Sequence, residues 1–117
     1  MHAPRSTRIV LLANAAWNLA HFRRGLIRAL VADGHDVVAA APPGDTMAQL
    51  AALGARTVPL PMDPTNASPL HDVALTTRIA RMLRTERPDV MLTYTIKPNI
   101  FGSAAARLCG VPSIATV

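Results

Sequence analysis

Apolar residues recur along this chain in two alternating patterns. Short continuous apolar runs predict strands that are buried on both faces, at Arg8–Ala13, Asp36–Ala41, Arg56–Leu60, Val90–Tyr94 and Pro112–Val117. Apolar residues at helical spacing predict helices between them, at Leu19–Asp33, Asp45–Leu53, Pro69 or Leu70 to Arg87, and Asn99–Leu108. Pro59 favours a position at the sheet edge for its strand, because proline cannot donate a hydrogen bond to a neighbouring strand.

The regular alternation of strand and helix predicts an α/β fold. Buried strands separated by helices favour a Rossmann-like, doubly wound parallel sheet of about five strands, with helices on both faces. Right-handed crossovers lead most naturally to a strand order of 3-2-1-4-5. We expect residues 1–117 to form a single domain. The sequence stops on a strand with no helix to cover that edge, so we interpret the chain as a fragment or as one subunit of a split enzyme.

The positive charge of the chain comes almost entirely from arginine. Lys97 is the only lysine, and the net charge is +5. This balance permits binding to nucleic acid, to anionic lipid head groups or to the phosphates of a nucleotide-sugar. Four arginines recur along the longest predicted helix, at Arg78, Arg81, Arg84 and Arg87. We interpret this stripe as a solvated face, with contact to a membrane surface as the alternative.

Several residue types and motifs that the sequence lacks restrict the cellular compartment and the cofactors that we expect. Cys109 is the only cysteine, so no intrachain disulfide can form, and we interpret it as a small buried hydrophobic residue in a cytosolic protein. No apolar run approaches the roughly 18 residues of a membrane span, and the N-terminal MHAPRSTR has no signal-peptide core. The first loop reads NAAWN instead of G-x-G-x-x-G, no G-x-x-x-x-G-K-[ST] occurs, and histidine and cysteine show no metal-ligand spacing.

The expected fold selects the loops in which a ligand would bind. Ligands of doubly wound sheets lie beyond the carboxyl ends of the strands, at the switch point between the first and fourth strands. This rule selects the loops at 14–18, 61–68 and 95–98, and it leaves His35 and Asp89 on the opposite rim.

Three residues in and after the first loop are candidates. Asn18 is expected either to cap the following helix or to bind a ligand. Trp17 is either a core anchor or a platform on which a sugar ring stacks. Arg23 falls on the apolar side of its helix, so its guanidinium must reach a carboxylate, a phosphate or water.

The stretch TYTIKPNIFGS at 93–103 carries the strongest local signal. Lys97 stands just before a helix whose N-terminal N–H groups favour an anion, and Pro98 suits the first helical turn. Thr95 and Asn99 are short polar neighbours. We expect this turn to bind a sugar, a phosphate or both; the alternative is an ordinary exposed loop lysine.

Two segments resemble a known family. RIVLLANAAWNLAHFRRGLIRAL at 8–30 and PDVMLTYTIKPNIFGSAAARLCGVPSIATV at 88–117 are similar to the N-terminal domain of GT-B glycosyltransferases of family four, of the type that builds bacterial surface polysaccharides and lipid-linked oligosaccharides. The resemblance implies a cleft-lining, substrate-binding role for Asn14, Trp17, Asn18, Arg23, Thr95, Lys97 and Asn99. Leu92 and Tyr94 stand where many relatives carry a histidine near the end of the fourth strand, and NAAWN replaces a glycine-rich loop.

The resemblance also implies an activity. It predicts transfer of a sugar, of the retaining type, from a nucleotide-diphospho-sugar to a lipid-linked or saccharide acceptor, with no cofactor besides the donor. The donor domain that follows in relatives is absent here, so this chain alone should be inactive and should need that domain or a separate catalytic subunit. We expect a cytoplasmic location, at the inner face of the membrane, with no nucleic-acid partner. The alternatives are a sugar-nucleotide epimerase of the same fold and a non-catalytic membrane-tethering subunit.

Overall fold

A parallel sheet organises the chain. In the computed structural model, which describes residues 7–63, 66 and 68–116, the strands pair in the order β3-β2-β1-β4-β5. The strands are β1 (Arg8–Leu12), β2 (Asp36–Ala41), β3 (Arg56–Pro59), β4 (Val90–Tyr94) and β5 (Ser113–Thr116). Every neighbouring pair is parallel, which confirms the predicted fold class and the edge position of β3. The predictions for residues 1–6, for Val117 and for residues 64, 65 and 67 of the loop at 61–68 lie outside the described residues.

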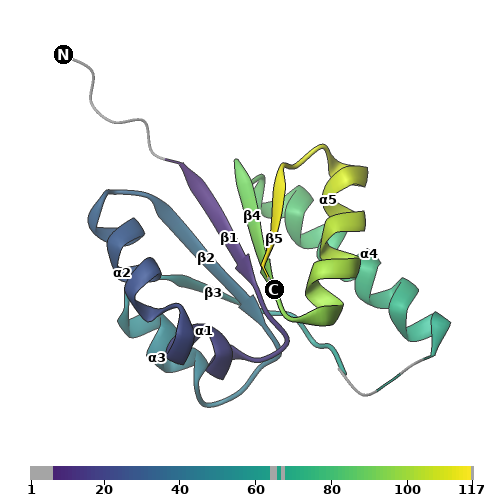
Figure 1. Cartoon of the computed structure of the whole chain (residues 1–117), viewed down its shortest axis with the longest axis horizontal. Helices are drawn as coiled ribbons and strands as arrows, with labels where there is room; N and C mark the ends of the chain where they lie inside the picture. The colour runs from purple at the N-terminus through teal and green to yellow at the C-terminus, as the bar shows by residue number, and fades with distance from the viewer. Residues whose placement is uncertain (1–6, 64–65, 67, 117) are drawn as a thin grey trace.

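Helices cover both faces of the sheet, as predicted. They are α1 (Ala16–Phe22), α2 (Arg24–Ala32), α3 (Met47–Ala52), α4 (Pro69–Glu86), the π-helix η1 (Pro98–Gly102) and α5 (Ser103–Cys109). Figure 1 shows α1, α2 and α3 on one side of the sheet and α4 and α5 on the other.

Successive side chains along the central strands pack alternately into two separate hydrophobic cores. Ile9 and Leu11 of β1 pack into the core under α1, α2 and α3, whereas Val10 and Leu12 pack into the core under α4 and α5. This division follows from the period of two along a strand. The longest helix, α4, carries apolar residues at helical spacing, and these are buried in the second core at Leu75, Ile79, Met82 and Leu83.

The predicted helix Leu19–Asp33 is wrong in its start and in its continuity. The first helix begins at Ala16, and the backbone breaks at Arg23, whose φ of −118° and ψ of 15° separate α1 from α2. The break changes the phase of the helix surface. An unbroken helix would place Phe22 and Leu26 on the same side as the buried Leu19, but both are exposed.

The helix after β4 also differs from the prediction. It begins at Pro98, one residue earlier than expected, and its first turn is the π-helix η1 instead of α-helix. Gly102 ends this turn close to the sheet. A Cβ atom at Gly102 would lie 3.0 Å from Thr93 Cγ2 and 3.1 Å from Leu12 Cδ2, so a larger residue would require these side chains to shift, whereas glycine lets η1 approach the ends of β1 and β4 closely.

Candidate functional site

The ends of β1 and β4 form the switch point of the sheet. Leu12 pairs with Thr93 in register, so the loop that begins at Asn14 and the turn that begins at Thr95 leave the sheet side by side. Three of the predicted site residues, Asn14, Thr95 and Lys97, thus lie on the rim that the fold rule selects.

Lys97 has two partners within the chain. Its Nζ atom lies 3.1 Å from Oδ1 of Asp72 and also donates a hydrogen bond to the main-chain oxygen of Asn66. The Lys97 side chain is only 14% exposed, so the alternative of an ordinary exposed loop lysine is wrong. Lys97 connects the turn after β4 to the start of α4, and Asp72 offsets its charge.

Sequence reasoning missed Asp72, and His71 lies beside it. Asp72 is the acidic residue in the first turn of α4, where a helix favours negative charge. His71 Nε2 accepts a hydrogen bond of 3.3 Å from the amide of Asp63, and its Nδ1 lies 3.8 Å from Asp72 Oδ1. This buried Nδ1 has no hydrogen-bond partner among the described residues. No local sequence pattern pairs Asp72 with Lys97, because the two residues are 25 positions apart.

The turn after β4 is strained. Thr95 has a φ of +74°, a left-handed conformation that is rare for a β-branched residue, and its hydroxyl donates to the carbonyl of Tyr94. Asn99 stabilises the turn through two hydrogen bonds. Its main-chain N–H donates to the Thr95 carbonyl at 3.1 Å, and its side-chain Nδ2 donates to the Thr116 carbonyl at 2.9 Å. The buried Oδ1 of Asn99 has no partner in the described part of the chain. Such strain is concentrated at functional sites.

Arg23 points at an aromatic ring. Its Cζ atom lies 4.5 Å from the centroid of the Tyr94 ring, which is buried at the end of β4. Burial raises the pKa of Tyr94, and the charge of Arg23 partly opposes this shift. Arg23 forms no ion pair with any described residue, and its buried Nε lacks a partner there. The ring is a partner that the sequence did not predict, and the phosphate-binding role of Arg23 stays a prediction.

Trp17 and Asn18 differ from part of what was predicted for them. Trp17 is 51% exposed, so it is not a core anchor. Its ring centroid lies 5.3 Å from that of Phe22, in a T-shaped arrangement, and 4.8 Å from that of His21. Its role as a sugar-stacking platform remains a prediction. Asn18 does not cap the helix, because α1 begins earlier and its N-cap residue is Ala15.

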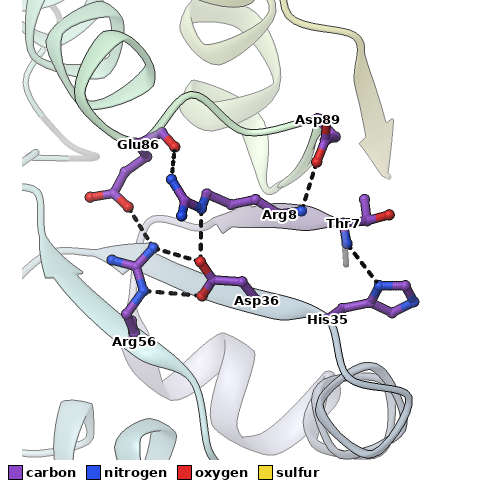
Figure 2. A network of polar contacts seen from close by, with 7 residues as sticks. All are labelled: Thr7, Arg8, His35, Asp36, Arg56, Glu86 and Asp89. Carbon is purple, nitrogen blue, oxygen red and sulfur yellow. Dashed lines mark hydrogen bonds and ion pairs between the residues drawn. The ribbon is translucent and has the colours of Figure 1, made fainter. Parts of the chain in front are cut away.

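The opposite rim holds an ion-pair network. Figure 2 shows that Asp36 lies between two arginines: Arg8 Nε is 2.7 Å and Arg56 Nε is 3.0 Å from its carboxylate. Arg56 Nη2 also lies 2.8 Å from Glu86. The pKa of Asp36 is lowered mainly by hydrogen bonding from Arg56. Partial burial raises this pKa, and hydrogen bonding from Arg8 lowers it further. The network connects the starts of β1, β2 and β3 to the end of α4.

His35 and Asp89 lie on this same rim, as predicted. His35 Nδ1 accepts a 3.3 Å hydrogen bond from the amide of Thr7, and Asp89 Oδ2 accepts a 2.8 Å bond from the amide of Arg8 (Figure 2). Both side chains serve the backbone at the starts of strands, away from the switch point.

Two further observations concern metals and membranes. Within residues 7–63, 66 and 68–116, no three histidine, cysteine, aspartate or glutamate side chains gather where they could hold a metal ion. In the same residues, no helix is both long enough and apolar enough to span a bilayer.

Comparison with known proteins identifies the family. Residues 19–117 match the model of the glycosyl transferase 4-like domain, and the chain belongs to this family. The family resemblance seen in the sequence is thereby confirmed. No match was found among curated proteins.

Solved structures support the fold. The glycotransferase of kitacinnamycin is 26% identical with a TM-score of 0.77, over 96% of this chain and 30% of that protein. MurG of Acinetobacter baumannii is 16% identical with a TM-score of 0.74, over 93% of this chain and 34% of MurG. The chain thus spans about a third of the length of these glycosyltransferases. The A40926 pseudoaglycone deacetylase Dbv21 has a similar fold, at 14% identity and a TM-score of 0.64 over 93% of this chain and 62% of that protein, so the fold alone does not define the reaction.

Proposed function

We propose that this chain is the acceptor-side domain of a glycosyltransferase that moves a sugar from a nucleotide-diphospho-sugar to a lipid-linked or saccharide acceptor in bacterial surface polysaccharide synthesis. The observation that carries the proposal is the turn after β4, in a chain that matches the glycosyl transferase 4-like domain. This turn combines a strained Thr95 with a largely buried Lys97–Asp72 pair at the switch point of the sheet. Backbone strain is costly and is concentrated at functional sites, which supports a ligand-binding role for this turn.

The reaction assigns a limited task to this domain. An acceptor hydroxyl displaces the nucleotide diphosphate from the anomeric carbon of the donor sugar, and the hydroxyl proton leaves during the transfer. Catalysis therefore requires that the acceptor be held in a fixed orientation and that charge developing on the diphosphate be offset. We assign Arg23 to a phosphate of the lipid-linked acceptor, because its guanidinium has no carboxylate partner among the described residues. We propose retention of configuration at the anomeric carbon on the basis of the family resemblance alone.

The proposal includes partners and location. The donor-binding groups and an acidic catalytic motif would come from a second domain or from a separate catalytic subunit. No cofactor other than the nucleotide-sugar is required, and nucleic acid is not a partner. A lipid-linked acceptor would be met in the cytoplasm at the inner face of the membrane.

A transfer assay tests the proposal. The complete enzyme, in which this chain is joined to its donor domain or catalytic subunit, is given a radiolabelled nucleotide-sugar and a lipid-linked saccharide, and the labelled lipid is counted. We expect Lys97→Ala to lower turnover by about tenfold or more, since misplacing a substrate by even ~1 Å can cost a hundredfold. Arg28→Ala is the matched control, because it also removes one positive charge, from an exposed side chain of α2 that is not among the candidate site residues.

Two outcomes of this assay would count against the proposal. Unchanged turnover in Lys97→Ala would remove the role of the turn after β4. Conversion of the nucleotide-sugar to its epimer without any acceptor would favour the epimerase alternative, and a catalytic subunit that is fully active without this chain would favour the tethering alternative.

A further inference from the structure

Arg23 lies between two core residues along the chain. Leu19 precedes it by four positions and Ile27 follows it by four, and both of these side chains are fully buried. The main-chain N–H of Arg23 donates to the Leu19 carbonyl at 3.1 Å, and its carbonyl accepts from the N–H of Ile27 at 2.9 Å, so α1 and α2 together fix its backbone. The Arg23 side chain is half-buried, and a cation in such a place needs a partner within the fold.

The ring of Tyr94 is that partner. The guanidinium carbon of Arg23 lies over this ring, 4.5 Å from its centroid. Tyr94 is only 4% exposed and packs in the same core as Leu19 and Ile27. Burial raises the pKa of Tyr94, so its hydroxyl is neutral under physiological conditions and does not form an ion pair with Arg23. The contact is therefore a cation–π interaction, which attracts the guanidinium to the ring and leaves its charge unneutralised.

This contact leaves the hydrogen-bond donors of Arg23 available. A guanidinium that stacks on a ring uses its face, whereas its N–H groups point outward in its plane and match two oxygens of a phosphate. No residue in the described part of the chain forms an ion pair with Arg23, and its buried Nε has no hydrogen-bond partner there. Tyr94 is the last residue of β4, directly before the left-handed Thr95, so the stacked guanidinium lies beside the rim on which a ligand is expected.

We propose that the Tyr94 ring positions Arg23 to bind a phosphate group. The ring holds the plane of the guanidinium, and Arg23 donates the hydrogen bonds to the phosphate oxygens. Tyr94 is thus a positioning residue that acts through Arg23. The inference deepens the proposed function and rests on it, because it takes the ligand of Arg23 to be a phosphate of the acceptor. Inorganic pyrophosphate is the probe, since it contains neither lipid nor saccharide, so a failure of sugar transfer is distinguishable from a failure of this inference.

NMR spectroscopy tests the geometry without any ligand. Tyr94 is the only tyrosine of the chain, so replacing it removes all tyrosine ring currents at once. We expect the ring to shift the side-chain protons of Arg23 upfield in the unmodified chain and in Tyr94→Phe, and these protons to return to ordinary positions in Tyr94→Leu. Amide spectra establish that each variant is folded. Arg23 protons at ordinary positions in the unmodified chain would overturn the inference.

Titration with pyrophosphate at constant ionic strength tests the binding role. Arg23→Gln should weaken binding by about tenfold or more, because it removes a charge-assisted hydrogen-bond donor. Tyr94→Leu should weaken binding by about fivefold, since it removes the cation–π contact, whereas Tyr94→Phe keeps the ring and should bind within about twofold of the unmodified chain. Arg24→Gln is the matched control: it removes the same charge from the neighbouring, exposed arginine and should also bind within about twofold.

A double variant shows whether Tyr94 acts through Arg23. Tyr94→Leu combined with Arg23→Gln should bind pyrophosphate no more weakly than Arg23→Gln alone, because the ring has no guanidinium left to position. A further fivefold loss in the double variant would overturn the inference, since Tyr94 would then act independently of Arg23. Absence of pyrophosphate binding by the unmodified chain, or an equal loss in Tyr94→Phe and Tyr94→Leu, would overturn it as well.

Steady-state kinetics of the complete enzyme extend the test to the acceptor. Tyr94→Leu should raise the KM for the lipid-linked saccharide by about fivefold and leave the KM for the nucleotide-sugar unchanged, because only the acceptor phosphate contacts Arg23. Tyr94→Phe should restore the acceptor KM. An equal rise in both KM values would contradict the positioning role, since a general weakening of the fold affects both substrates.

Discussion

At the scale of single residues, the pairing of Lys97 with Asp72 changes what the turn after β4 can contribute. The sequence suggested a free cation at a helix N-terminus. In the structure the ammonium is shared between Asp72 and the carbonyl of Asn66, so Lys97 primarily fixes two loops of the switch-point rim relative to each other. Arg23 has no such carboxylate partner in the described residues and is the stronger candidate for a phosphate ligand.

The Lys97–Asp72 pair should behave as a coupled unit. Lys97→Met and Asp72→Asn should each lower the free energy of unfolding by about 1–3 kcal/mol, because each leaves a largely buried polar group without its partner. The double variant should lose clearly less than the sum of the two, with a coupling energy of about 0.5–3 kcal/mol. Urea denaturation of the four proteins measures this cycle. Strictly additive losses would mean that the two side chains do not interact in solution.

At the scale of elements, the sequence predicted what depends on local pattern. The bounds of β4 and the buried stripe of α4 follow from apolar periodicity, and both are confirmed. The break at Arg23 and the π-helix after Lys97 carry no such signal, because each is a local backbone change inside an otherwise helical sequence. The Lys97–Asp72 pair was also missed, since its members are 25 residues apart and only the folded chain brings them together.

Gly102 is the residue on which the packing of η1 depends. Gly102→Ala should destabilise the protein by about 1–3 kcal/mol, because the new methyl group would crowd Thr93 and Leu12 at the ends of β4 and β1. Gly25→Ala is the matched control: it lies in α2 with no atom within 4 Å of the new Cβ, so helix propensity should raise stability by about 0.5–1 kcal/mol. Thermal denaturation of both variants checks the prediction. Equal effects would show that the close approach of η1 is not required.

The network around Asp36 should make stability depend on pH. Arg56 and Arg8 lower the pKa of Asp36 in the folded chain, so the ionised carboxylate stabilises the fold at pH values above its unfolded pKa. That contribution is lost as the pH falls through the lowered folded pKa. Asp36→Asn should therefore lower the free energy of unfolding at pH 7 by about 1 kcal/mol, a modest amount because the ion pairs are partly exposed. The same variant should show a smaller difference in stability between pH 7 and pH 3 than the unmodified chain. Urea denaturation at the two pH values measures it, and an unchanged pH difference in the variant would contradict the assignment.

At the scale of the whole molecule, the two rims of the sheet have different tasks. The amino-terminal rim is held by ion pairs and backbone hydrogen bonds among Arg8, Asp36, Arg56, Glu86 and Asp89. The carboxyl rim carries the left-handed Thr95, a partly buried ion pair and buried polar atoms that lack partners in the described chain. The carboxyl rim is also where a doubly wound α/β sheet is expected to bind its ligand.

The central claim is that this domain binds the acceptor and not the donor. The most direct measurement titrates the ¹⁵N-labelled chain with a short-chain, lipid-linked saccharide diphosphate and, separately, with nucleotide-sugars, while amide chemical shifts are followed. We predict that the acceptor analogue shifts the amides at 14–23 and 95–99, and that Arg23→Gln weakens this binding while the exposed control Arg24→Gln does not. Nucleotide-sugars should leave these amides unchanged. Shifts produced by a nucleotide-sugar but not by the acceptor analogue would contradict the account.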